Sequence, residues 1–221
     1  MKVQSRRLLV VLLALPSFSG AWRHALAQGG PPLLTDDPET PGSRRWEINI
    51  AYTLEQARRE REFQSPLLDL NYGLGDRIQL KFELPWAIVS RDDNPRRNGL
   101  GNSLAGVKWR FLDAERRGIA MSLYPQLTFN NPTSSVDRGV VERGSRFKVP
   151  VEMSRSFGRF AVNGEFGYEG VQHQNDERLY GIALGYEVSR RLELLSEIHG
   201  IELRGPGEGE VLINVGGRCR L

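Results

Sequence analysis

The chain has 221 residues, with 30 Lys and Arg against 27 Asp and Glu, and a formal net charge of +3. Residues 1–27 hold four of these basic residues and no acid, so the rest of the chain carries a formal charge of −1. The basic character therefore belongs to the first segment, which removes the main support for a nucleic-acid-binding function. The single cysteine, Cys219, excludes an intrachain disulfide.

Residues 1–27 have the pattern of a secretory signal peptide. Basic residues at the start precede an apolar run at 8–15, and Ala25-Leu26-Ala27 supplies small residues at a cleavage site. The apolar run is too short for a membrane-spanning helix, which needs about 20 residues. We therefore expect an exported protein that is cleaved before Gln28.

Residues 28–45, which we call the leader, are rich in proline and glycine. Pro31-Pro32, Asp37-Pro38 and Pro41-Gly42 interrupt any regular element, so neither a helix nor a central strand is expected there. The predicted structure is an extended leader in the periplasm.

From Trp46 to the end, apolar and polar residues alternate with a period of two, which is typical of strands with two different faces. Trp46, Ile48 and Ile50, for example, alternate with Glu47 and Asn49. The pattern predicts about ten strands. They are expected at 46–55, 64–74, 77–88, 102–112, 119–130, 146–153, 159–168, 180–188, 191–202 and 210–221.

Strand length and connection length both favour a membrane barrel over a soluble β-sandwich, which remains the alternative. The strands run to about 10–13 residues, whereas strands in globular sheets average about 5–6. Short turns alternate with longer connections, as in barrels with short periplasmic turns and longer outer loops. Aromatic residues also fall near both strand ends, as interfacial girdles do. Residues 46–221 are thus expected to form an all-β, up-and-down antiparallel transmembrane β-barrel of about ten strands.

Four prolines lie inside predicted strands, at Pro66, Pro85, Pro125 and Pro150. Proline lacks the N–H that a strand donates to its neighbour, so it is normally confined to edges and bulges. We expect bulged or broken pairing at these four positions.

Three segments resemble a known family. They are PLLTDDPETPG at 32–42 followed by WEIN at 46–49, DLNYGLGDRIQL at 69–80 ending in ELPW at 83–86, and GLGNS at 99–103 with GVKWRF at 106–111. This pattern is similar to outer-membrane proteins of the meta-pathway of phenol degradation family. The resemblance implies an outer-membrane barrel described as a transporter, sometimes encoded near genes for aromatic degradation, with no catalytic residues. The chain departs from the usual aromatic C-terminal residue of such barrels, because it ends in Leu221.

The inward positions of the predicted barrel are rich in charge of both signs. The predicted lumen-lining residues are Glu47, Asp69, Arg77, Lys81, Glu83, Lys108, Arg110, Lys148, Glu152, Arg159, Glu165, Glu193, Glu197 and His199. One interpretation is a charged conduit for a polar or anionic solute. The other is a lumen filled by salt-bridged side chains.

The sequence therefore predicts passive or weakly selective passage of small solutes, aromatic compounds among them. A structural or surface-interaction barrel with a plugged lumen is the first alternative. A hydrolase at the rim, using His173 with Asp176 and Asp92-Asp93, is the second. No nucleophile motif, phosphate loop or metal-ligand spacing occurs, so we expect no enzyme, cofactor or metal site. The expected partners are outer-membrane lipid and lipopolysaccharide, the barrel assembly machinery and a small solute, with no nucleic acid.

Overall fold

A computed structural model describes residues 7–11, 33–56, 60–92, 94–203 and 209–219. The predicted cleavage site before Gln28 and the C-terminal Leu221 lie outside these residues. Within them the protein is all-β and antiparallel, and thirteen strands belong to one sheet.

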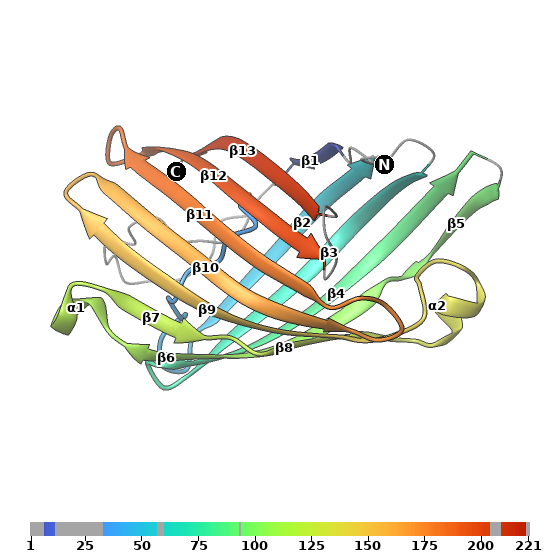
Figure 1. Ribbon diagram of the computed structural model, residues 1–221, viewed down its shortest axis with the longest axis horizontal. Helices are drawn as coiled ribbons and strands as arrows, with labels where there is room; N and C mark the ends of the chain where they lie inside the picture. The colour runs from blue at the N-terminus through green and yellow to red at the C-terminus, as the bar shows by residue number, and fades with distance from the viewer. Residues whose placement is uncertain (1–6, 12–32, 57–59, 93, 204–208, 220–221) are drawn as a thin grey trace.

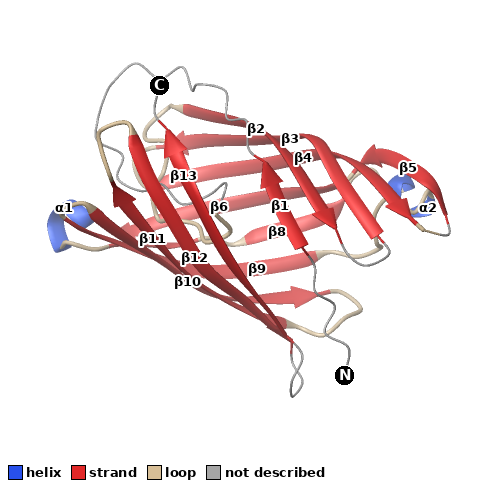
Figure 2. Cartoon of the chain, turned by 90° about the horizontal axis from the view of Figure 1, so that it is seen from above, coloured by secondary structure: helices blue, strands red, loops and turns tan. Residues whose placement is uncertain are grey.

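The strands follow one another in chain order. They are β1 (Arg7–Val11), β2 (Trp46–Gln56), β3 (Glu60–Leu74), β4 (Ile78–Arg91), β5 (Asn94–Leu100), β6 (Asn102–Leu112), β7 (Ala120–Leu123), β8 (Gln126–Asn130), β9 (Arg146–Phe157), β10 (Phe160–Val171), β11 (Glu177–Glu187), β12 (Leu192–Leu203) and β13 (Gly209–Cys219). Each main strand pairs with the next, while β5 pairs with β4 and β8 pairs with β6 and β9. Two short helices, α1 (Ala114–Arg117) and α2 (Ser134–Asp137), lie at opposite ends of the strands (Figures 1 and 2).

The sheet curves strongly around an interior. Figure 1 shows β9 to β13 crossing in front of β2 to β4, and the whole path is a single sheet. A β-sandwich has two sheets packed face to face, whereas the described strands form a single sheet. Within the described residues, β13 pairs with β12 alone, and the outer edge of β2 is paired with β1. The strand β1 lies inside the predicted signal segment.

Most of the predicted strands are present, and the differences are local. The strand expected at 119–130 is divided into β7 and β8 around Tyr124 and Pro125. The connection expected at 91–101 contains β5, which pairs with the part of β4 beyond the residues that pair with β6. Residues 94–100 read NPRRNGL, so turn-forming residues hide this strand from a search for alternating hydrophobicity.

The expected irregularities at the four prolines are confirmed. The register between β3 and β4 shifts between Gln64 and Leu67, at Pro66, and the shift ends opposite Pro85. Pro125 separates β7 from β8, and the pairing with β9 correspondingly stops at Val151 and resumes at Lys148, leaving out Pro150. The missing donor of each proline accounts for the interruption.

The two faces of the sheet differ sharply in polarity. The outer face carries most of the exposed large apolar side chains, including Trp46, Phe166, Ile182 and Val215, the last being 84% exposed. The inner face carries buried polar and charged residues, including Lys108, Glu152 and Glu197, each at 2% exposure or less. This arrangement is inverted relative to a soluble globular protein, whose charged residues are almost never fully buried unless paired.

Candidate functional site

The described part of the leader, residues 33–45, lies against the inner face of the curved sheet. Leu33, Thr35, Asp37 and Pro38 are buried there. The sequence predicted an extended periplasmic leader without indicating contacts to the strands, whereas these residues contact the inner face of the sheet. The proline-rich composition does keep them free of strand and helix, and their unpaired backbone groups bond to side chains of the wall instead.

Lys108 on β6 is the centre of the contacts between leader and wall. Its ammonium group lies 3.3 Å from a carboxylate oxygen of Asp36 and 3.1 Å from Oε2 of Glu152 on β9. It also donates to the main-chain carbonyl of Asp37 and lies 4.6 Å from the ring centroid of Tyr124. Since the Lys108 side chain is 2% exposed, these groups replace its hydration shell.

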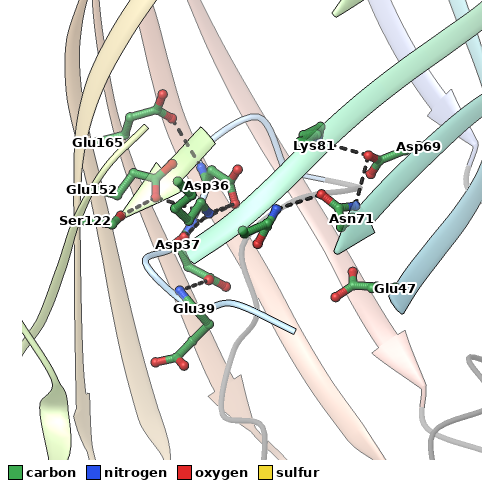
Figure 3. Close-up of polar contacts among 12 residues, drawn as sticks. Asp36, Asp37, Glu39, Glu47, Asp69, Asn71, Lys81, Ser122, Glu152 and Glu165 are labelled. Atoms are coloured by element: carbon green, nitrogen blue, oxygen red, sulfur yellow. Dashed lines mark hydrogen bonds and ion pairs between the residues drawn. The ribbon is translucent and has the colours of Figure 1, made fainter. Parts of the chain in front are cut away.

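Carboxylates of β10 and β12 bind the main chain of the leader. The two carboxylate oxygens of Glu197 on β12 accept hydrogen bonds from the amides of Leu34 and Thr35, both at 2.8 Å. Glu165 on β10 accepts from the amide of Asp36 at 3.2 Å. Figure 3 shows Asp36 and Asp37 lying among Ser122, Glu152 and Glu165. The leader thus presents acids to a lysine and amides to carboxylates.

A second group of contacts holds the end of the leader near the rim. Arg110 on β6 pairs with Glu39, and its Nε lies 3.1 Å from Asp113. The hydroxyl of Thr40 donates to the main-chain carbonyl of Asp76 at 2.9 Å. The amide of Arg44 donates to the carbonyl of Gly73 at 2.8 Å, and the amide of Gly73 donates to Arg45 at 2.9 Å. The leader is therefore fixed along its described length.

Two inward glycines permit this close approach. A Cβ atom at Gly73 would lie 1.8 Å from the carbonyl oxygen of Gly42. One at Gly181 would lie 2.3 Å from the hydroxyl of Thr35. Both distances are far below a van der Waals contact, so any larger residue would push the leader away from the wall.

Beside the leader, a polar network joins β2, β3 and β4. Lys81 lies 2.7 Å from Glu83 and 3.3 Å from Asp69. Asp69 accepts hydrogen bonds from Asn71 at 2.9 Å and from Asn49 at 3.2 Å, and Glu47 accepts from Asn49 at 3.1 Å. Figure 3 shows Lys81, Asp69 and Asn71 grouped together. Neighbouring charges of opposite sign on this part of the wall are therefore paired.

The two leader aspartates titrate differently. Burial raises the pKa of Asp37 to about 6, helped by the nearby charges of Asp36 and Glu39 and opposed by Lys108. Burial also acts to raise the pKa of Asp36, but the charges of Lys108 and Lys81 and a hydrogen bond from the Asp37 amide outweigh it, so the pKa falls below its usual value. Asp36 is thus the stable anion of the pair.

Of the other predicted lumen-lining residues, three are paired or buried inside. Lys148 lies 2.8 Å from Glu165, Glu193 lies 3.5 Å from Arg218, and His199 is buried. Arg77 and Arg159 do not line the interior. Both lie in turns at the strand ends and are exposed, with Arg77 paired to Asp113.

The residues of the suggested rim hydrolase lie in two connections. His173 and Asp176 belong to the β10–β11 connection, and Asp92 follows β4. His173 is exposed, and Asp176 accepts a hydrogen bond from the hydroxyl of Tyr168. Among the described residues, nothing in this arrangement orients the imidazole as a catalytic base.

The leader contacts were missed from the sequence, although two signals for them exist. Acids at 36, 37 and 39 face inward cations at 108 and 110, and glycines occupy the inward positions 73 and 181. In the described part of the chain, no cluster of His, Cys, Asp and Glu is suited to holding a metal ion. No helix there is long and apolar enough to cross a membrane. Compared with models of known families and with curated proteins, the chain matches none.

Proposed function

We propose that this chain is an outer-membrane β-barrel that passes small solutes and whose interior is closed by its own leader. The observation that carries the proposal is that the leader is held by reversible ionic and hydrogen-bonded contacts, centred on Lys108 and Glu197. Solutes pass when the leader leaves this position. The suggested solutes are small and polar or aromatic, and the family resemblance supports the aromatic class.

The distribution of apolar residues supports a membrane location. The aromatic pairs Trp46–Tyr72 and Phe160–Tyr186, each with ring centroids 4.8 Å apart, lie at the strand ends that carry short turns, and Trp46 and Phe160 are exposed. Aromatic rings favour the headgroup level of a bilayer. Between the ends, outward side chains such as Ile182 and Ile213 are more than half exposed, which in water would create a large apolar patch.

The strand arrangement supports closure into a barrel. If β7 and β8 count as one strand and β5 as an extension of β6, the strands from β2 to β13 number ten. An even number makes β2 and β13 antiparallel, so their edges can pair once β1 is removed with the signal segment. Barrels of about eight strands are just filled by side chains, so a ten-stranded barrel has room for an extended segment.

A permanently plugged structural barrel is the second candidate, favoured by the wall pairs such as Lys81 with Glu83 and Lys148 with Glu165. Both candidates are tested with the chain from Gln28 onward, reconstituted into liposomes. We expect it to float with the lipid, to pass benzoate and glycerol slowly, and to pass them faster after Gly181→Val. Failure to integrate into lipid would contradict the barrel. If both proteins insert into the lipid and neither the unaltered chain nor the Gly181→Val variant passes benzoate or glycerol, the structural alternative would be established.

A further inference from the structure

We infer that the inner wall is a binding site for short acidic peptides in an extended conformation, and that the leader occupies it as an internal competitor. This inference rests on the proposed closure by the leader and names the ligand class of the same site. The site consists of Lys108, Arg110, Glu165 and Glu197.

The cationic half of the site recognises carboxylates and a peptide carbonyl. Lys108 contacts the Asp36 carboxylate at 3.3 Å and donates to the Asp37 carbonyl. Arg110 pairs with the carboxylate of Glu39. If the leader leaves, Lys108 keeps only Glu152 of its carboxylate contacts and loses both leader oxygens. The buried Lys108 then requires replacement acceptors, whereas Arg110 keeps Asp113 and the carbonyl of Asp76.

The anionic half recognises the main-chain amides of the same ligand. Glu197 accepts from two successive amides at 2.8 Å, and Glu165 accepts from the next one at 3.2 Å. A simple inorganic anion has no amide to donate, so Glu165 and Glu197 would keep only their wall partners Lys148 and Asn214. A ligand with amide donors beside carboxylates satisfies both halves, and that combination is the chemistry of an acidic peptide.

The wall is shaped for a backbone rather than for a bulky ligand. Gly181 lies against Thr35, and Gly73 lies against Gly42, at distances that exclude a Cβ atom on the wall. Such close approach marks places where another backbone or a ligand comes against a strand; at Gly73 it is the main chain of Gly42, and at Gly181 it is the side chain of Thr35. Free peptides must compete with a tethered segment whose effective concentration is in the millimolar range. Binding of a free peptide should therefore become measurable when the contacts between the leader and the wall are weakened.

The test uses the full protein in detergent micelles and the fluorescent probe acetyl-Leu-Thr-Asp-Asp-Pro-Glu-amide, with binding measured by anisotropy. Asp36→Asn/Glu39→Gln should bind this probe at least about tenfold tighter than wild type, because the leader loses its carboxylate contacts with Lys108 and Arg110. Adding Lys108→Met should abolish that gain. Arg146→Met is the matched control, since Arg146 pairs with Glu169 and Glu177 away from the leader, and it should leave binding unchanged.

Gly73→Val provides a second route, because it displaces the leader by steric contact and leaves Lys108 and Glu197 intact. It too should bind the probe more tightly than wild type. Equal affinity for wild type and both leader-weakened proteins would overturn the inference, as would binding that survives Lys108→Met. Equal binding of a probe with Asn, Asn and Gln in place of its acids would also overturn it. These measurements need no membrane passage, so the proposed transport can fail independently.

Discussion

The ammonium group of Lys108 lies 3.1 Å from Oε2 of Glu152, and both side chains are almost completely buried. The two residues stand on β6 and β9, with β7 between them, and Ser122 of β7 donates to the same carboxylate oxygen at 2.5 Å. The leader completes this group through Asp36 and the carbonyl of Asp37. The position of the leader and the burial of a charged pair therefore depend on each other.

Lys108→Met should destabilise the protein strongly, because it leaves the buried Glu152 carboxylate without its cation. Breaking a buried pair in this way typically costs about 3–5 kcal/mol. The free energy of unfolding in urea, measured in lipid vesicles, is the test. Lys108→Met/Glu152→Gln should recover part of the loss, and a double variant as unstable as the sum of its single changes would contradict the coupling.

Gly181→Val should release the leader without altering any charge, since a Cβ at this position would lie 2.3 Å from Thr35. Protease cleavage after Arg44 or Arg45 measures the release and should accelerate in the variant. Gly164→Ala is the control, because a Cβ there meets only ordinary contacts, the nearest being Met153 at 3.6 Å. Equal cleavage of Gly181→Val and wild type would argue against the close contact between leader and wall.

Acidification should strengthen the binding of the leader to the inner wall. The pKa of Asp37 is raised to about 6 in the folded chain, above its ordinary value of 3.8, so the seated leader binds a proton more readily than the released one. The binding of the leader to the wall therefore strengthens as the pH falls from 7.5 to 5, by about tenfold. A nitroxide on Leu34→Cys, in a Cys219→Ser background, should be less mobile at pH 5. Asp37→Asn should remove the pH dependence, and persistence of the effect would assign it to another group.

The direction of the strands makes a prediction about surface access. Asn131 and Gln174 lie in the longer connections, whereas Arg190 lies in a short turn at the opposite strand ends. In the Cys219→Ser background, cysteines at 131 and 174 should react with an impermeant maleimide on intact cells, and one at 190 should not. The reverse pattern would mean that the barrel is inserted the other way round.

Alternation was sufficient to predict most of the strands and their faces, because a strand with one apolar and one polar side repeats every two residues. The same logic predicted the interruptions at Pro66 and Pro125, whose missing donors break the ladder. The position of the leader did not follow from local pattern. Its Thr-Asp-Asp-Pro sequence specifies only irregular backbone, and the contact with Glu197 joins residues far apart in the chain.

Arg77 and Arg159 show a second limit of sequence-based prediction. The alternation of inward and outward positions assigned both residues to the interior. This alternation applies only within a strand, and both residues lie in turns. β5 escaped prediction for a related reason. It pairs with β4 without an alternating apolar face, so the periodicity that marks the other strands is absent from it.

Conductance across a planar lipid bilayer tests most directly whether the leader closes the interior. The comparison is between the chain from Gln28 onward and the same chain without residues 33–43, each inserted in equal amounts. We predict little or no steady current through the complete chain. The shortened chain should carry a steady current, because the space held by the leader fills with water and Glu165 and Glu197 lose the amides they bind. A complete chain that conducts as well as the shortened one would contradict the account.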